Sequence, residues 1–104
     1  MLQVEFKNRH LVHLYQKGKA RKYPLPTGVI KKFSMRMQQI EAAVNIYDLW
    51  KTSSLNFERL QGFENRFSLR LDNKYRLEME IEWEDEERTR GTVYILKISK
   101  HYGD

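Results

Sequence analysis

The chain has no cysteine, only two prolines and five glycines, and no apolar run that approaches the length of a membrane-spanning helix. The lack of cysteine excludes disulfide bonds and thiolate chemistry. Residues 1–7 contain no hydrophobic signal-peptide core, so we expect a cytoplasmic protein without a membrane partner. The sequence also has no glycine-rich phosphate loop and no serine in a nucleophile elbow, so neither a P-loop hydrolase nor a serine hydrolase is supported.

The chain is rich in charge, and that charge is unevenly placed. Its 104 residues, 40% apolar and 32% charged, predict one soluble globular domain spanning residues 1–104. Residues 1–40 carry nine basic side chains and one acidic side chain, a net charge of +8, whereas residues 41–104 carry 10 basic and 13 acidic, a net charge of −3. This asymmetry favours a polyanion or an acidic protein as partner, and a solvated basic surface is the alternative.

The first half of the chain predicts one strand and two helices. Residues 3–7 alternate as a strand, and Asn8 is suited to cap a helix that ends near Gly18. A second helix should run from Thr27 or Gly28 to Val44. Its apolar stripe consists of Ile30, Phe33, Met37, Ile40 and Val44. Residues 45–50 then form a short turn or a helical extension.

The second half of the chain has the pattern of strands, at about 55–60, 65–71, 75–83 and 91–99. The last strand has apolar residues at both odd and even positions, which indicates a central or doubly covered strand. The acidic run 84–87 fits a solvated hairpin tip. This order predicts an α+β domain, in which an N-terminal strand and two helices pack on an antiparallel sheet.

The most informative local feature is a pair of arginines. If residues 72–74 form a three-residue turn, Leu71 faces Tyr75, the apolar residues of both strands share one side, and Arg70 stands directly opposite Arg76. Like charges opposite each other on a sheet are unfavourable unless an anion lies between them. A phosphate would be such an anion, and so would a neighbouring glutamate.

These arginines suggest chemistry on RNA. No metal site or other cofactor is predicted, because His10 and His13 share a helix face but have no third ligand nearby. RNA is cleaved without metal when its own 2′-OH attacks the adjacent phosphate, a reaction that needs a base, an acid and a cation. Arg70 and Arg76 could supply the cation, and the tail Lys100-His101-Tyr102 a proton donor or acceptor. Ordinary surface ion pairs and a flexible tail remain the alternative.

Several motifs occur in a characteristic order. Val4-Glu5-Phe6 precedes the helix that ends at Gly18, Leu25-Pro26 precedes the long helix, and residues 40–49 read IEAAVNIYDL. Leu60-Gln61-Gly62, Ser68-Leu69-Arg70-Leu71, Tyr75-Arg76-Leu77 and Trp83-Glu84-Asp85 then follow. Over nearly the whole chain, this series resembles the HigB toxins of the RelE/ParE toxin superfamily, and the resemblance implies a RelE-like fold.

The resemblance also implies a function. It implies a ribosome-dependent endoribonuclease that cuts mRNA in the decoding site, an mRNA interferase. It implies as partner an antitoxin with a helix-turn-helix domain, similar to HigA. By this analogy Arg76 stabilises the scissile phosphate, His101 transfers protons with Tyr102 beside it, and Arg70 contacts the phosphate. We further expect Lys100, Arg59 and Lys74 to bind RNA.

The tail departs from the family pattern. Many relatives end the last strand with Asp-Tyr-His, where this chain has Ser99-Lys100-His101-Tyr102, and some relatives carry a further histidine where this chain has Phe57-Glu58-Arg59. His101 could therefore work with Lys100, Tyr102 or Arg59, and the choice of general acid and general base stays open. A ParE-like gyrase inhibitor, a non-enzymatic basic RNA-binding domain and an inactive toxin relative that binds antitoxin remain alternatives.

Overall fold

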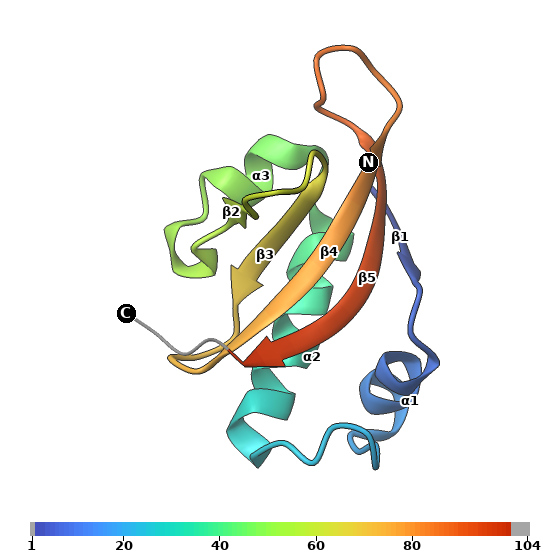
Figure 1. Cartoon of the computed structure of the whole chain (residues 1–104), viewed down its shortest axis with the longest axis vertical. Coiled ribbons are helices and arrows are strands. Elements are labelled where there is room, and N and C mark those ends of the chain that lie inside the picture. The colour runs from blue at the N-terminus through green and yellow to red at the C-terminus, as the bar shows by residue number, and fades with distance from the viewer. Residues whose placement is uncertain (1, 101–104) are drawn as a thin grey trace.

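The computed structural model describes residues 2–100, which form one five-stranded sheet and three α-helices (Figure 1). Among these residues no helix combines the length and the hydrophobicity that crossing a bilayer requires. The helices are α1 (Arg9–Lys17), α2 (Thr27–Ala42) and α3 (Ile46–Trp50), and a 3₁₀ turn, η1, spans Ser53–Leu55. The strands are β1 (Gln3–Phe6), β2 (Glu58–Arg59), β3 (Arg66–Arg70), β4 (Tyr75–Trp83) and β5 (Gly91–Lys100).

The sheet has the order β1-β5-β4-β3-β2, so β5 lies inside it, as its apolar residues at both parities predicted. β1 pairs with β5 in parallel, and all other neighbouring strands are antiparallel. The predicted α+β class is thus confirmed, with the refinement that the first strand makes the sheet mixed. The short helix α3 occupies the segment where a turn or helical extension was expected.

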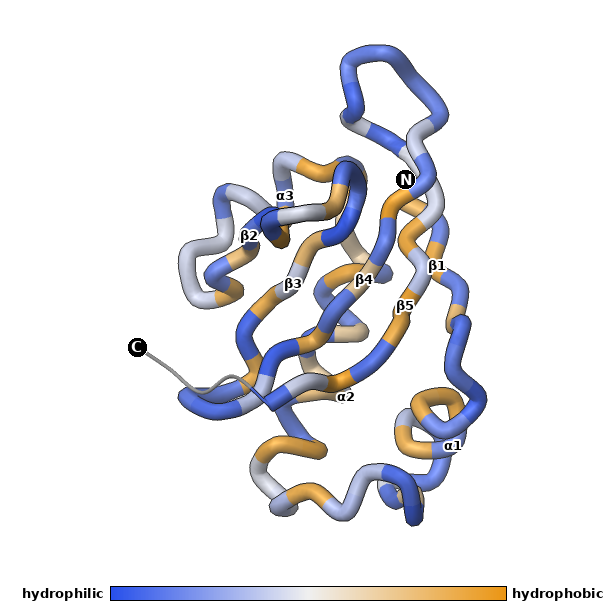
Figure 2. Tube along the Cα trace, in the orientation of Figure 1, coloured by the Kyte–Doolittle hydropathy of each residue, from blue (hydrophilic) through white to orange (hydrophobic). Residues whose placement is uncertain are grey.

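The hydrophobic core lies between the sheet and α2, which crosses one face of the strands (Figures 1 and 2). α2 contributes Val29, Phe33, Met37 and Ile40, and the three long strands contribute residues such as Leu69, Leu77, Met79, Ile81, Val93 and Ile95. Fully burying one such side chain contributes roughly 1.5–3 kcal/mol. Because side chains alternate along a strand, the residues between them, including Ser68 and Arg76, point to the opposite face of the sheet.

Helix ends follow local sequence signals closely. The Asn8 side chain accepts a hydrogen bond from the His10 backbone N–H, and Gly18 ends α1 with a φ of 76°, both as predicted. α2 ends at Ala42, two residues before the predicted end at Val44, whose side chain is 58% exposed. The chain turns there because Asn45 begins α3 with a capping box completed by Asp48.

The strand predicted over residues 55–60 is largely wrong. Leu55 ends the 3₁₀ turn, Asn56 is left-handed with a φ of 45°, and only the two residues of β2 pair with β3. The segment is held by packing, since the Phe57 ring stacks on the Phe67 ring with centroids 5.2 Å apart. The apolar residues of segment 55–60 therefore mark side chains that are buried, such as Leu55 and Phe57, and not an extended backbone.

The turn between β3 and β4 has the predicted register. The backbone N–H of Leu71 donates to the Tyr75 carbonyl at 2.9 Å, and Arg70 pairs with Arg76 across the strands. The Asp72 carboxylate closes the turn by accepting the backbone N–H groups of Lys74 and Tyr75, each at 2.8 Å. The facing arrangement of the two arginines is confirmed.

The β4–β5 loop depends on one carboxylate, that of Asp85. It accepts hydrogen bonds from the Thr89 hydroxyl and from the backbone N–H groups of Thr89 and Arg90, and these bonds lower the pKa of Asp85. Since the pKa of Asp85 is lower in the folded state than in the unfolded state, the charged carboxylate stabilises the fold at pH values above its unfolded pKa. This stabilisation is lost as the pH falls through the folded pKa. We expect Asp85→Asn to lower the melting temperature at pH 7 and to have no effect at strongly acidic pH.

The matched control is Glu86→Gln, which removes one charge from the neighbouring exposed position of the same acidic loop. It should leave the melting temperature nearly unchanged at both pH values. Equal effects of the two substitutions in thermal unfolding followed by circular dichroism would show that Asp85 has no special role in the loop.

Candidate functional site

Arg76 is buried on the face of the sheet opposite α2, with 7% of its surface exposed. Its Nε donates to the Ser68 hydroxyl at 2.8 Å, and its Nη2 donates to the carbonyl oxygens of Asn56 at 2.6 Å and Ser68 at 3.3 Å. The guanidinium therefore fastens the segment before β2 to the surface of β3. Because these bonds are buried, replacing Arg76 would disturb the fold as well as any function.

The charges around Arg76 are poorly balanced. Burial lowers the pKa of Arg76, Glu58 at 3.6 Å from its Nη2 raises it, and Arg70 lowers it again. Arg70 is exposed and donates to the side-chain oxygen of Asn73. Among residues 2–100, no carboxylate lies within ion-pair distance of Arg70. Of the two anions considered from the sequence, a glutamate is present beside Arg76, and within residues 2–100 neither anion pairs with Arg70.

Arg36 is a third arginine of this region, and it was not among the site residues predicted from the sequence. It is 5% exposed on α2, and its guanidinium donates to Arg70 O, Ser54 O and Gln39 Oε1, each at 3.0 Å. Burial, and then the charge of Arg70, lower the pKa of Arg36. A signal existed, because Arg36 follows Phe33 by three positions and precedes Ile40 by four, which places it on the buried stripe.

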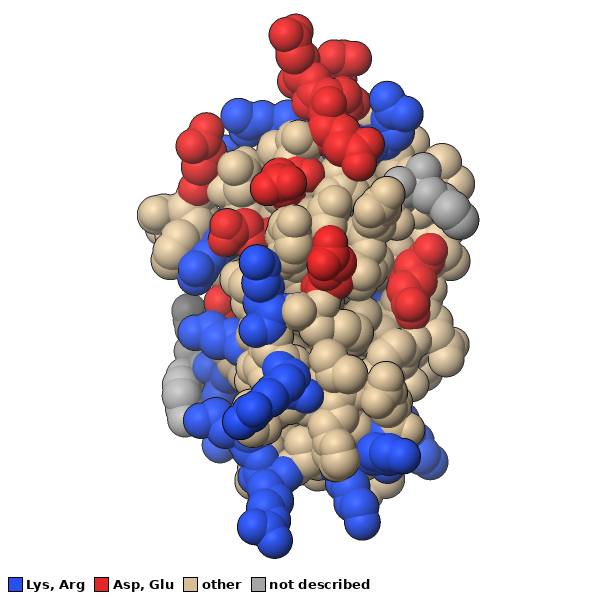
Figure 3. Space-filling model, turned by 90° about the vertical axis from the view of Figure 1, so that its right-hand side faces the viewer, with Lys and Arg blue, Asp and Glu red and all other residues tan. Residues whose placement is uncertain are grey.

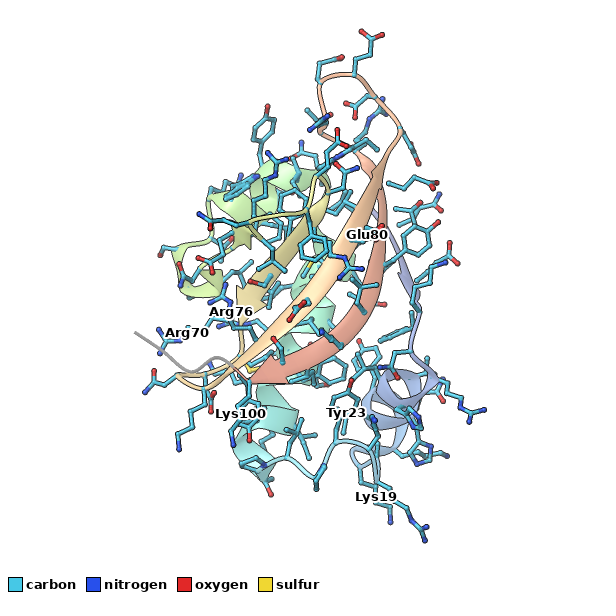
Figure 4. The ribbon with its side chains drawn as sticks, viewed as in Figure 1. Lys19, Tyr23, Arg70, Arg76, Glu80 and Lys100 are labelled. Carbon is cyan, nitrogen blue, oxygen red and sulfur yellow. The ribbon has the colours of Figure 1, made fainter. Side chains whose placement is uncertain are left out.

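A basic cleft of about 680 Å³ opens beside these arginines, between the first half of α2 and the β3–β4 turn. Among residues 2–100, its lining contains five basic side chains and one acidic side chain: Lys32, Arg36, Arg70, Lys74, Lys100 and Asp72. Figure 4 shows Arg70 and Arg76 near the end of the β3–β4 hairpin and Lys100 at the end of β5. A cleft with this excess of positive charge is suited to an anionic ligand.

The structure thus brings together some of the predicted site residues. Arg70, Lys74 and Lys100 line the cleft, and Arg76 stands across the strand pair from Arg70. Arg59 is exposed on β2 and does not line the cleft. His101 and Tyr102 lie outside the described residues. His10 and His13 are both exposed on α1, and no cluster of three or more metal-ligating side chains occurs within residues 2–100.

Basic and acidic side chains are also separated between the two ends of the molecule. Figure 3 shows basic side chains gathered at the end that holds α1 and the start of α2, and acidic side chains gathered over the β4–β5 loop at the opposite end. The +8 charge of the first 40 residues is therefore concentrated in space and not dispersed. Such a distribution orients a polyanion before it makes contact.

A three-helix α+β domain with this mixed sheet and a basic cleft at one end has the architecture of a RelE-like toxin. The sequence confirms this class, because residues 4–102 match the family described as "RelE-like toxin of type II toxin-antitoxin system HigB". Since the match covers almost the entire chain, the protein belongs to the HigB-like toxin family. No curated protein matched the chain.

Membership has two direct consequences. The protein is a toxin of a type II toxin–antitoxin system, and it therefore has an antitoxin partner. Toxins of this family are generally endoribonucleases, so RNA is the polyanion that the family assignment favours.

Proposed function

We propose that the protein is an endoribonuclease that cuts mRNA on the ribosome without a metal ion. The 2′-OH of the RNA attacks the adjacent phosphate, the phosphorus–5′-oxygen bond breaks, and a proton passes to the leaving 5′-oxygen. Arg70 and Arg76 hold the phosphate and balance the charge that develops on it. His101 transfers protons, Tyr102 orients the reacting groups, and Lys100, Lys74 and Arg59 bind the RNA strand.

The observation that carries this proposal is the register of the β3–β4 hairpin. It fixes two arginines opposite each other, and the single carboxylate in ion-pair contact with either of them within residues 2–100 is Glu58. Repulsion between facing cations costs stability, and a bound phosphate removes that cost. Arginine also presents a planar fork that grips two phosphate oxygens at once.

Ribosome binding would use the basic segment between α1 and α2. Residues 17–22 contain Lys17, Lys19, Arg21 and Lys22. The Asn8 amide donates to the Tyr23 hydroxyl at 3.0 Å and to the Leu96 carbonyl at 3.2 Å, so it ties the loop to the middle of β5. Figure 4 shows Lys19 and Tyr23 near α1, on the other side of the sheet end from Arg70. Ribosomal RNA contacts there would weaken steeply with salt.

The partner follows from the same assignment. The antitoxin would carry a helix-turn-helix domain of the HigA type, bind the toxin and repress the operon that encodes both proteins. A ParE-like toxin that inhibits DNA gyrase is the alternative within the superfamily. A chain that merely binds RNA is the alternative outside enzymes.

Induction in bacteria separates these functions. We expect growth to stop, full-length transcripts to be lost and a DNA-damage reporter to stay silent. Intact transcripts with an active reporter would instead identify a gyrase inhibitor. The absence of any growth defect would leave the RNA-binding domain and the inactive toxin relative that binds antitoxin.

Arg70→Gln tests the phosphate contact without disturbing the fold. Arg70 is exposed and bonded to a turn residue, so the melting temperature should stay within about 2 °C. Loss of one donor to the developing charge should slow RNA cleavage by roughly 100-fold. The matched control is Arg66→Gln at the other end of β3, where Arg66 lies 3.8 Å from Glu80. Wild-type cleavage by Arg70→Gln, measured with purified ribosomes and message, would remove Arg70 from the site.

A further inference from the structure

We propose that the basic cleft binds a second phosphate of the RNA backbone, next to the scissile phosphate, and that Lys32 of α2 is a direct ligand of it. This inference rests on the proposed function for the identity of the ligand, but the cleft itself is defined by the fold. It assigns a specific contact to α2, whose apolar stripe was expected to pack in the core and whose lysines were counted only in the overall basic charge of residues 1–40.

Among residues 2–100, the lining of the cleft contains one carboxylate beside its five basic side chains. That carboxylate belongs to Asp72, and it already accepts the backbone N–H groups of the β3–β4 turn. Within residues 2–100, no ion pair joins Asp72 to Lys32 or Lys74. Several cations held around one hollow raise the local concentration of anions.

The floor of the cleft is preorganised by Arg36. Its three acceptors come from α2, η1 and the end of β3, so one buried guanidinium locks together the elements that line the cleft. Within residues 2–100 Arg36 forms no ion pair with a carboxylate, and its three acceptors are uncharged oxygens, so its own hydrogen bonds do not cancel its positive charge. Because the Arg36 side chain is already held in place, its charge attracts an anion in the cleft without a further loss of side-chain conformational entropy.

The cleft and the scissile site face different sides of the sheet. Tyr75 pairs with Lys100 and both line the cleft, whereas the next pair, Arg76 with Ser99, points to the other face. Arg70 lies at the boundary, because it stands opposite Arg76 and also lines the cleft. An RNA strand held at Arg70 and Arg76 therefore passes the edge of the sheet and places its neighbouring phosphate over the cleft.

The size and surface of the cleft fit a nucleotide unit. Its volume of about 680 Å³ falls in the range of sites that hold a small organic ligand and exceeds what one inorganic ion needs. The half-buried Tyr75 ring lies in the lining, 6.0 Å from the Lys100 ammonium. An aromatic ring beside cations is a common platform for a base next to its phosphate.

The test is binding, not cleavage, so that it stands apart from the proposed activity. A 2′-O-methyl RNA hexamer cannot be attacked by its own 2′-oxygen, and its affinity is measurable by fluorescence anisotropy at several salt concentrations. We expect Lys32→Gln to weaken binding about 3- to 10-fold and to reduce the salt slope by about 1. Lys31→Gln is the matched control, since Lys31 is the adjacent exposed lysine of α2 and does not line the cleft. It should change neither quantity.

Two results would overturn the inference. One is equal weakening by both substitutions, which would indicate a general charge effect. The other is an unchanged affinity and an unchanged salt slope for Lys32→Gln, which would show that Lys32 does not contact the strand. If transcripts stay intact on induction while Lys32→Gln still loses affinity selectively, the proposed nuclease fails and the phosphate site stands.

Discussion

Replacing His101 with alanine is expected to slow RNA cleavage by about 10²- to 10⁴-fold and to relieve growth arrest on induction. The physical reason is that the arginines cannot exchange protons near neutral pH, because guanidinium stays charged. A histidine side chain gains and loses a proton in that range. The reaction needs both a proton acceptor and a proton donor, so removing the histidine that follows the end of β5 should remove one of them.

The control for His101→Ala is His13→Ala. His13 is exposed on α1, beside β1 and away from the β3–β4 hairpin (Figure 1), so its replacement should leave toxicity and cleavage intact. Cleavage is measured by primer extension on an mRNA translated in vitro. Full activity of His101→Ala with an unchanged cutting pattern would mean that another group transfers the proton.

Arg36→Met is expected to lower the melting temperature by about 8–16 °C, which corresponds to about 2 kcal/mol. Methionine has a similar length and removes the cost of burying a charge. It leaves the Arg70 and Ser54 carbonyls without the donor that they now share. Leaving these carbonyls unpaired lowers the free energy of unfolding by more than removing the buried charge raises it. Each carbonyl loses a hydrogen bond, and water reaches these sites too poorly to replace it.

Lys31→Met is the control for this substitution, because it places the same residue on the exposed face of the same helix. It should shift the melting temperature by no more than about 2 °C. Arg36→Lys should fail to restore stability, since one ammonium cannot reach three acceptors that the fork of arginine reaches together. A melting temperature of Arg36→Met equal to that of the wild type would show that Arg36 is not the anchor of this region.

The predictable parts of the fold rest on short-range rules. The cap at Asn8, the helix end at Gly18 and the turn at residues 72–74 depend on residues a few positions apart. The first two were predicted correctly, and the turn, which was the condition for placing the two arginines, is formed. The register of the β3–β4 hairpin could also be predicted, because a shift of the pairing by one residue would move every apolar side chain of one strand to the wrong face. The facing arginines came with that register.

The parts that were missed depend on long-range contacts. Arg36 was counted only as one of the nine basic side chains of residues 1–40, and arginine is rarely buried. Its two carbonyl acceptors lie 18 and 34 residues further along the chain, out of reach of local rules. Ser68 is fully buried on the polar side of β3 because Arg76 and the segment before β2 cover it. Sequence periodicity reports which face a residue takes and not what later covers that face.

The arginines divide between structure and function in a way that guides mutagenesis. Arg36 and Arg76 are buried and hold neighbouring segments together, so their variants combine loss of stability with loss of activity. Arg70 is exposed opposite Arg76, and within residues 2–100 no carboxylate pairs with it. It is therefore the residue whose replacement reports on phosphate binding with the least disturbance of the fold.

If the protein cuts messages while they are translated, mapping of mRNA 5′ ends after induction should reveal it. We expect new 5′ ends inside translated reading frames, at a fixed position within codons, and their loss in His101→Ala. Growth arrest with unbroken transcripts, or cuts that ignore the reading frame, would contradict it.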